Sequence, residues 1–255
     1  MFIFNILTSF ASDLKEIKPY DENNTDKKTE VTAMFDNIAP YYDLLNRVLS
    51  VGIDTIWRKK AIAQLDKSKC KRILDIATGT ADLAVEISKQ LPESQIIGLD
   101  ISSKMIDLAG KKITKKHLQD RIQVEVGDSE NLRFEDNSFD ATTASFGVRN
   151  FGNLVSGLKE MYRILKPGGQ IVILEFSRPR VFPFKQLFNT YFKYILPVIG
   201  RVKSKDPKAY KYLYESVQHF PDYDQFGDIL KEVGFNKVSW KPLSFGICTI
   251  YLGEK

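Results

Sequence analysis

Small residues and two acids between residues 73 and 100 form a pattern that suits a nucleotide-like ligand. The stretch Ile73–Leu83 reads ILDIATGTADL, with Asp75 inside an apolar run and Gly79 in the small-residue segment that follows. A tight turn between a buried strand and a helix lets a ligand approach the backbone and the free N–H groups of the helix. Asp100 ends a second apolar run, where a carboxylate can accept hydrogen bonds from both hydroxyls of a ribose.

The number of glycines in this loop argues against a dinucleotide site. The NAD fingerprint needs three glycines in the order G-x-G-x-x-G, whereas only Gly79 is present. With Asp75 at its start, the loop instead resembles the first motif of the class I S-adenosylmethionine-dependent methyltransferases. In those enzymes the loop packs on the amino-acid part of the cofactor. A buried strand and turn of another α/β protein is the structural alternative.

The alternation of strands and helices after Arg72 predicts the fold class. Apolar runs indicate strands at 73–76, 96–100, 122–126, 139–146 and 170–176, with helices at 82–91, 105–113 and 154–165. This order is typical of a parallel sheet with right-handed crossovers. A helix at 223–233 then precedes strands at 238–240 and 247–252, which a short link makes antiparallel. We expect an α/β, Rossmann-like class I methyltransferase fold: a seven-stranded, mostly parallel sheet with a terminal antiparallel hairpin and helices on both faces.

Individual residues predict where the helices begin and end. Asp82 is a candidate N-cap for the helix at 82–91, and Ser102 or Ser103 for the following helix. The sequence KPGG at 166–169 is expected to stop the helix before it and to turn the chain.

Composition restricts the class of protein. A chain of 255 residues is long enough for one substantial core, and a net charge of +5 does not by itself indicate a nucleic-acid partner, so we expect none. The two cysteines and two histidines have no metal-binding or disulfide spacing, which favours a reducing cytoplasm and no metal. The first ten residues are apolar but too few to span a bilayer.

Two segments flank the predicted sheet inside one methyltransferase domain at 31–255. Residues 1–30 are expected to be flexible, because 13–30 are polar and charged. Residues 31–70 carry an aromatic helical pattern that predicts either a lid over the ligands or a core-packing helix. Residues 178–214 are aromatic and basic. This insertion either caps the sheet or lies on an anionic membrane surface and guides a lipid tail inward.

Longer motifs resemble the menaquinone/ubiquinone-biosynthesis C-methyltransferase family over about nine-tenths of the chain. They are FDNIAPYYDLLNRVLSVGIDTIWR, LDIATGTADL, ASFGVRN, MYRILKPGGQIVILEF and YLYESVQHFPD. The KPGG and cofactor-loop motifs recur across class I methyltransferases, whereas SFGVRN together with LEFS and ESVQHFPD is more specific. Ala81 stands where this family usually has glycine. Because this change adds only one methyl group, we expect it to be tolerated.

The resemblance implies roles for named residues. Thr80 would contact the methionine end of S-adenosylmethionine, Asp100 the ribose, and Asp128 with Ser129 the adenine. Ser145 would lie beside the reacting centre, at the carboxyl end of a strand. The implied cofactor-binding residues are Asp75, Gly79, Thr80, Asp100, Asp128, Ser129 and Ser145. For Asp128 the structural alternative is a turn residue after a strand.

The implied reaction is methylation of a ring carbon of a prenylated quinol. Ring carbon is a weak nucleophile until a hydroxyl of the quinol loses its proton, so a base or a bound water is needed. We expect Arg149 to stabilise the phenolate and Asn150 to position the water, with Asp128 taking part if it points inward; a structural Arg149 paired with an acid is the alternative. Demethylmenaquinol is the expected substrate. A benzoquinol of the ubiquinone branch or another small lipophilic molecule stays open, as do peripheral contact with the inner face of the membrane and a homodimer.

Overall fold

A seven-stranded sheet in the order β3-β2-β1-β4-β5-β7-β6 is the centre of the computed structural model, which describes residues 17–20, 25–50, 52–191, 194 and 206–255. The strands are β1 (Arg72–Ile76), β2 (Gln95–Asp100), β3 (Ile122–Val126), β4 (Phe139–Ser145), β5 (Leu165–Phe176), β6 (Asn236–Leu243) and β7 (Cys248–Glu254). Neighbouring strands from β3 to β5 pair in parallel, and β7 is antiparallel to both β5 and β6. The predicted fold class is confirmed.

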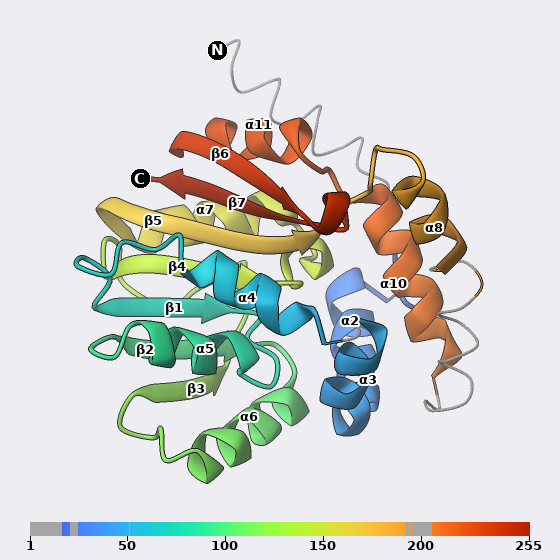
Figure 1. Ribbon diagram of the computed structural model, residues 1–255. Helices are drawn as coiled ribbons and strands as arrows, with labels where there is room; N and C mark the ends of the chain where they lie inside the picture. Colours follow the sequence, from blue (N-terminus) through green and yellow to red (C-terminus); the bar gives the residue numbers. More distant parts are fainter. Residues whose placement is uncertain (1–16, 21–24, 51, 192–193, 195–205) are drawn as a thin grey trace.

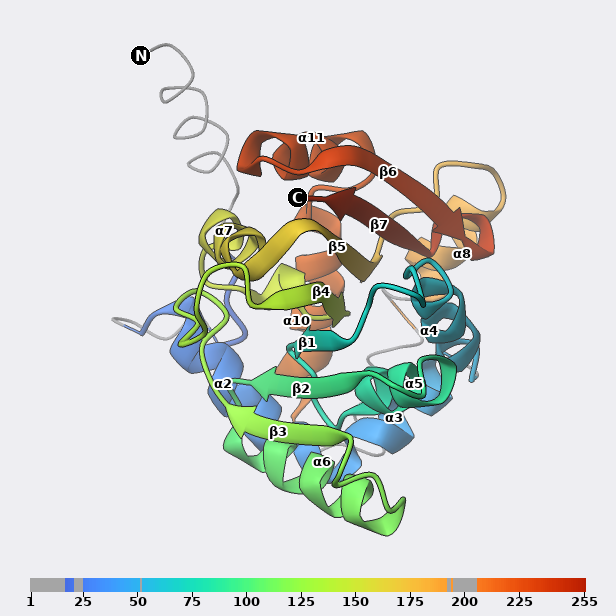
Figure 2. The ribbon, with the colours of Figure 1, turned by 90° about the vertical axis from the view of Figure 1, so that its left-hand side faces the viewer.

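Helices cover both faces of the sheet and the edge where the parallel strands end (Figures 1 and 2). The helices are α2 (Lys27–Ile38), α3 (Tyr42–Leu49), α4 (Asp54–Ile62), α5 (Asp82–Gln90), α6 (Ser103–Lys115), α7 (Leu154–Ile164), α8 (Phe184–Thr190), α10 (Pro207–His219) and α11 (Asp224–Val233). In Figure 1, α4 and α5 lie in front of the sheet and α7 and α11 behind it. Helices α2, α3, α8 and α10 lie beyond the carboxyl ends of β1 and β4, where open α/β sheets bind ligands.

Alternating side chains of the strands supply two separate cores. Ile73 of β1 belongs to the core under α4 and α5, whereas Leu74, its neighbour in sequence, belongs to the core under α7 and α11. Successive residues of a strand point to opposite faces, so a strand covered on both sides is apolar throughout. This is why the run around Ile73 predicted a doubly buried strand.

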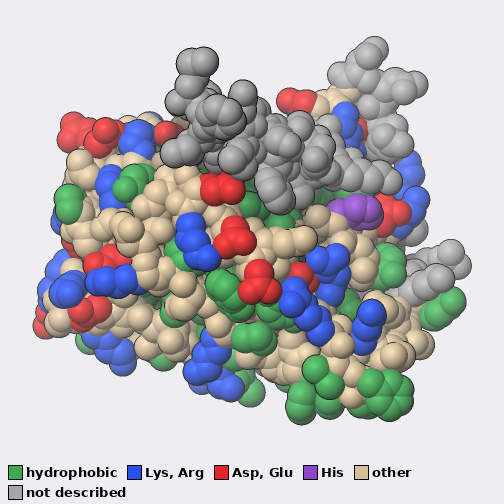
Figure 3. All heavy atoms as spheres, turned by 90° about the horizontal axis from the view of Figure 1, so that it is seen from above, with side chains coloured by type: hydrophobic (Ala, Val, Ile, Leu, Met, Phe, Trp, Pro, Cys, Tyr) green, Lys and Arg blue, Asp and Glu red, His purple; other side chains and the backbone are tan. Residues whose placement is uncertain are grey.

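The outer face of the molecule seen from above mixes basic and acidic side chains, and hydrophobic side chains gather along one margin of it (Figure 3). Within the described part of the chain, no helix combines the length and the apolar character that crossing a membrane requires.

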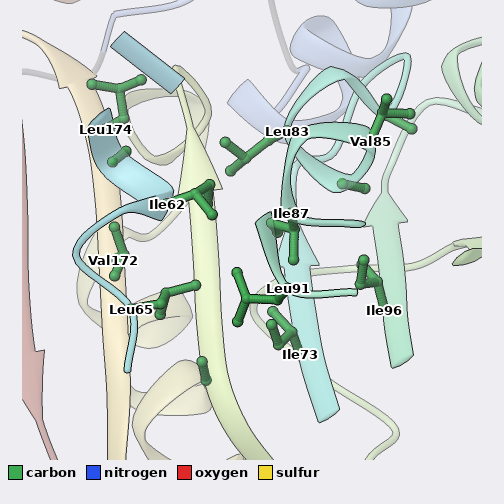
Figure 4. Packing of buried hydrophobic residues seen from close by; sticks show 14 of the residues in the cluster. Ile62, Leu65, Ile73, Leu83, Val85, Ile87, Leu91, Ile96, Val172 and Leu174 are labelled. Carbon is green, nitrogen blue, oxygen red and sulfur yellow. The ribbon is translucent and has the colours of Figure 1, made fainter. Parts of the chain in front are cut away.

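The core beneath α4 and α5 packs aliphatic side chains of both helices against the sheet (Figure 4). Ile87 of α5 lies close to Ile73 and Ile96 of the sheet, whereas Ile62 of α4 lies on the side of Val172, and the three isoleucines of α5 and the sheet are at most 1% exposed. This packing fixes β1 relative to α5, and so fixes the loop between them.

One local prediction was wrong, and another holds only in part. The N-cap of α5 is Ala81, in a left-handed conformation with φ 65°, and Asp82 is the first helical residue and makes no capping bond. Its carboxylate instead lies 2.6 Å from the Lys112 ammonium. The helix before KPGG does end there, at Ile164, but β5 already begins at Leu165, so KPGG is an irregular part of the strand, where the register against β4 shifts between Phe139 and Ala141. Gly168, with φ +76°, lies within that strand.

The N-terminal and insertion segments are described only in part. Helix α2 begins at Lys27, capped by Asp26, whose side chain accepts a 2.8 Å bond from the Thr29 N–H. It therefore starts four residues before the boundary expected at 31. The apolar residues 1–10 and most of the polar segment before 25 lie outside the described residues. So do residues 192–193 and 195–205 of the aromatic, basic insertion.

Candidate functional site

The turn after β1 is held by a buried carboxylate. Both oxygens of Asp75 accept bonds, from Thr78 Oγ1 at 2.6 Å and from Thr143 Oγ1 of β4 at 2.7 Å. Burial raises the pKa of Asp75 to about 6, although both threonine hydroxyls oppose the shift. Asp75 therefore joins the loop to β4, and it does not line either of the cavities described below.

Gly79 and Asp100 meet at the carboxyl ends of β1 and β2, as the sequence predicted. The Gly79 N–H donates to Asp100 Oδ2 at 2.8 Å, and the Ser102 N–H donates to Asp100 Oδ1 at 2.9 Å. Burial raises the pKa of Asp100, and the backbone donors partly oppose it. Gly79 has φ +55°, which glycine adopts without the cost that a Cβ would bring. A carboxylate has about four lone-pair positions, so Asp100 can still accept from a further donor.

A cleft of about 60 Å³, here called the small cleft, lies beside this pair. Of the predicted residues, it is lined by Gly79, Asp100, Asp128, Ser129 and Asn150. Chain segments meet closely along its wall. A Cβ added to Gly147 would lie 2.4 Å from the Cβ of Ala77. Only glycine fits at Gly147 without displacing the loop after β1.

Two predicted cofactor residues lie outside the small cleft. Thr80 is 3% exposed; its hydroxyl donates to Asp43 Oδ1 at 2.5 Å and accepts from the Lys112 ammonium at 2.9 Å. Ser145 is the last residue of β4 and, like Thr80, lines neither cavity. Thr80 therefore fastens α3 to the loop in this conformation.

Helix α2 closes over the small cleft through its two lysines. Lys28 bonds Asp128 Oδ2 at 2.7 Å and lies 3.2 Å from Glu130. Burial lowers the pKa of Lys28, but the bonds to these two carboxylates outweigh it and raise the pKa. Lys27 donates to the carbonyl oxygens of Arg149 at 3.0 Å and Phe151 at 2.7 Å. The start of α2, which precedes the segment predicted as a lid, is thus joined to the carboxyl end of β4.

A second cavity of about 370 Å³, here called the large cavity, adjoins the small cleft. Its volume falls within the range of about 300–1,000 Å³ that is typical of small-molecule sites. Apolar and aromatic side chains from the N-terminal helices, the sheet and the insertion make most of its wall: Met34, Ile38, Ile53, Trp57, Phe176, Phe184, Leu187, Phe188, Tyr191, Tyr210, Leu213 and Ile247. Four residues line both spaces: Phe35, Tyr42, Phe146 and Asn150. They form the partition between them.

Arg149 and Asn150 both line the large cavity, each with a partner. Arg149 Nη1 lies 2.7 Å from Glu175 Oε1, and these side chains are 7% and 0% exposed. Burial raises the pKa of Glu175 and Arg149 opposes the shift. The Tyr212 hydroxyl donates to Asn150 Oδ1 at 3.0 Å. Arg149 therefore forms the ion pair with an acid that a purely structural role would require. It also lines the large cavity, as a role in the reaction would require. Asp128 lines only the small cleft.

Several residues at the site were not identified from the sequence. Tyr42 lies in the partition, Lys28 covers the small cleft, and Glu175 holds Arg149. Glu175 had a signal, because an acid ends the apolar run of β5 as Asp100 ends that of β2. Tyr42 had none, since its position depends on how α3 packs. Among the described residues, no group of acids, cysteines and histidines could hold a metal ion.

Comparisons with known proteins identify the family. A sequence model of the ubiE/COQ5 methyltransferase family matches residues 23–255. The chain is 45% identical over 241 residues to a protein of Bacteroides fragilis named demethylmenaquinone methyltransferase, covering 94% of this chain and 98% of that one. It is 48% identical over 232 residues to a protein of Geotalea daltonii named ubiquinone/menaquinone biosynthesis C-methyltransferase UbiE, covering 91% and 98%.

Solved structures share the fold at low sequence identity. An S-adenosylmethionine-dependent methyltransferase of Aquifex aeolicus aligns with a TM-score of 0.56 at 16% identity, covering 77% of this chain and 88% of that one. The [4+2]-cyclase SpnF aligns with a TM-score of 0.60 at 17% identity, covering 89% and 96%. Because a cyclase shares the architecture, the fold alone does not give the reaction.

The buried carboxyl of Asp75 predicts a dependence of stability on pH. Its pKa of about 6 in the folded protein lies above the ordinary 3.8, so between these values the folded state retains a proton that the unfolded state loses. The contribution of Asp75 to the free energy of unfolding should therefore fall as the pH rises from 4 to 6, by about 2–3 kcal/mol, and then level off.

Asp75→Asn removes this titration. Denaturant unfolding of both proteins from pH 4 to 7 gives the difference between their free energies of unfolding, wild type minus variant. This difference should decrease with pH. A difference that stays constant or increases would contradict a raised pKa.

Proposed function

The chain belongs to the ubiE/COQ5 methyltransferase family, and on this basis we propose that it transfers the methyl group of S-adenosylmethionine to a ring carbon of a prenylated quinol. The observation that carries the proposal is the partition of Phe35, Tyr42, Phe146 and Asn150, which lines both the small cleft, with its carboxylates Asp100 and Asp128, and the apolar large cavity. A donor in one and an acceptor in the other would meet there.

The small cleft has groups that suit an adenosine. The Asp100 carboxylate can accept from the ribose hydroxyls, and Asp128 can accept from the exocyclic amine of adenine, with Ser129 beside it. Gly79 leaves open space beside its backbone, because a Cβ there would meet only the Tyr42 ring, at 3.6 Å. Because Lys28 occupies Asp128 at 2.7 Å, the adenine amine would take the place of that ammonium, which can remain with Glu130. Asp75 and Thr80 would support the cleft from behind.

The large cavity would hold the ring of the acceptor. When bound, S-adenosylmethionine supplies a methyl group on a positively charged sulfur. The protein then has to hold the ring carbon about 3–3.5 Å from that methyl group and to favour loss of a hydroxyl proton. Arg149, which keeps its own proton, would stabilise the phenolate, and Asn150 would orient the water that carries the proton away. Ser145 is the last residue of β4 and precedes Arg149 and Asn150 by a few positions in the sequence.

A naphthoquinol is the substrate that we favour. Relatives from Bacteroides fragilis and Porphyromonas gingivalis, 45% and 42% identical to this chain, are named demethylmenaquinone methyltransferase. A benzoquinol is the second candidate, because the Geotalea daltonii relative has a name that covers both quinones.

Mass spectrometry of the quinones from cells that lack the protein would test the substrate. Accumulation of demethylmenaquinone supports the naphthoquinol, and accumulation of a desmethyl benzoquinone supports the second candidate. An unchanged quinone pool would indicate that another lipophilic molecule is methylated.

The substrate's tail has to leave a membrane, and we propose that the protein contacts the inner face of the cytoplasmic membrane. Val181, Phe182, Leu187 and Phe245 form an exposed rim, here called the apolar rim, with Phe182 76% exposed and Phe245 68% exposed. Leu187 also lines the large cavity, so the rim continues into it. Figure 3 shows hydrophobic side chains along one margin of the molecule. The buried free thiols Cys70 and Cys248 suit a reducing compartment.

Homodimer formation stays a prediction from the sequence. Size-exclusion chromatography with light scattering distinguishes it from a monomer.

Replacing Asp100 should weaken cofactor binding. Asp100→Asn removes the charged acceptor that faces the small cleft, and hydrogen bonds to charged groups are the stronger ones. We expect the Kd for S-adenosylmethionine, measured by isothermal titration calorimetry, to rise about 10- to 100-fold. Asp107→Asn, on the exposed side of α6, is the control and should bind like wild type. A Kd for Asp100→Asn within threefold of wild type would remove the ribose assignment.

Neutralising the Arg149–Glu175 pair should slow turnover without weakening cofactor binding. Both charges are removed together, as Arg149→Met with Glu175→Gln, because a buried charge left without its partner is strongly destabilising. Without a cation beside the phenolate, kcat should fall about 100-fold or more. The Kd for S-adenosylmethionine should stay within about threefold of wild type, since neither side chain lines the small cleft. Wild-type kcat in the double variant would leave the pair with a structural role only.

Loss of the apolar rim should weaken membrane binding. Phe182→Ser with Phe245→Ser removes two exposed rings, each of which is worth about 1.5–3 kcal/mol when fully buried. Co-sedimentation with vesicles that contain phosphatidylglycerol should fall about tenfold or more. Val126→Ser, at a 56% exposed position on β3, is the control. Equal sedimentation of wild type and the double variant would exclude the rim as the contact.

A further inference from the structure

A buried ion pair on α4 lies in the wall of the large cavity, away from Arg149. Asp54 and Arg58 are one helical turn apart, and each side chain is 7% exposed. The guanidinium of Arg58 donates to Asp54 Oδ2, and Ser50 Oγ donates to Asp54 Oδ1 at 2.7 Å. All three residues line the large cavity. Both oxygens of the Asp54 carboxylate thus accept a hydrogen bond, and the bond to Arg58 holds the guanidinium in one orientation.

Arg58 keeps an unused donor at this wall. Its Nε is buried, and no acceptor among the described residues bonds it. A buried N–H without an acceptor costs free energy, and a buried ion pair gives little net stability compared with apolar side chains of the same size. Arg58 Nη1 also lies 3.7 Å from Asp82 Oδ2 at the start of α5, so the guanidinium joins α4 to α5 as well as lining the cavity. Because Nε is covered by protein, a ligand in the cavity would meet the guanidinium at another of its N–H groups.

Arg58 and Arg149 lie against the same pair of neighbouring aromatic rings, Arg58 near Phe146 and Arg149 near Phe176. The rings of Phe146 and Phe176 lie 4.5 Å apart between centroids, at 33° to each other. The guanidinium carbon of Arg58 is 5.8 Å from the centroid of Phe146, and that of Arg149 is 5.4 Å from the centroid of Phe176. Both rings line the large cavity. The cavity thus has two separate cationic positions on a mostly apolar wall.

We propose, on the basis of the function proposed above, that Arg58 binds the second ring oxygen of the quinol. The two oxygens of a 1,4-quinol lie at opposite ends of its ring, so one at Arg149 leaves the other to be bound elsewhere on the wall. The guanidinium of Arg58, which lines the cavity, donates to that oxygen, and Asp54 is a positioning residue that acts through Arg58. Two fixed oxygens define the plane and the direction of the ring. They therefore determine which ring carbon faces the methyl donor.

Two substrates that differ by one oxygen test this proposal under reducing conditions. One is a short-chain prenylated 1,4-naphthalenediol, and the other is the naphthol that keeps only the hydroxyl next to the accepting carbon. Wild type should prefer the diol in kcat/KM by about 10- to 100-fold, the worth of a hydrogen bond to a charged donor. In Asp54→Asn with Arg58→Met the preference should fall to within about threefold, mainly through a higher KM for the diol.

Three further measurements separate the explanations. Lys60→Met, an exposed position on the same helix, is the matched control and should keep the wild-type preference. The affinity for S-adenosylmethionine shows whether the double variant is folded. If it is not, Arg58→Lys keeps a cation beside Asp54 while displacing the donor, and should reduce the preference at least threefold.

The outcomes distinguish this inference from the function on which it rests. A folded double variant, or Arg58→Lys, that keeps the wild-type preference for the diol would overturn the role of Arg58 and leave the proposed function standing. Wild-type protein that methylates neither substrate would overturn both.

Discussion

Three carboxylates buried at the carboxyl ends of β1, β2 and β5 control the arrangement of the site. Asp75 and Glu175 are 0% exposed and Asp100 is 7% exposed, and a buried charge has to be bonded. Asp75 is bonded by two threonine hydroxyls, Asp100 by two backbone N–H groups, and Glu175 by Arg149. Each of these bonds positions one loop. The three loops therefore meet at one edge of the sheet in a fixed relation.

Polar contacts of the N-terminal helices complete the site over this edge. Lys28 contacts Asp128, Asp36 accepts from Ser102 Oγ at 2.5 Å, and Asp43 accepts from Thr80. These bonds join α2 and α3 to loops that follow three different strands. Helices α2 and α3 and the sheet edge thus form one continuous wall, and the aromatic residues of the partition separate the small cleft from the large cavity.

Local patterns in the sequence were enough for the sheet and for part of the site. The apolar runs and the positions of Gly79 and Asp100 follow from strand and turn chemistry within a few residues, and the structure places those two residues 2.8 Å apart. Glu175, Tyr42 and Arg58 depend on contacts between segments far apart in the chain, which periodicity does not reveal. Asp82 looked like an N-cap, but Ala81 in a left-handed conformation begins the helix and leaves the Asp82 carboxylate to Lys112.

The partition shared by the two cavities ties their occupancies together thermodynamically. Phe35, Tyr42, Phe146 and Asn150 contact whatever lies on either side, so a ligand that shifts them changes the free energy of the other ligand. Linkage makes this effect reciprocal: the factor by which one ligand alters the affinity of the second equals the factor in the opposite direction. In the proposed function, with the donor in the small cleft and the acceptor in the large cavity, altering these four side chains to accept a larger ring would therefore also change the affinity for the methyl donor. Ring selectivity and donor affinity would then be coupled through the same side chains.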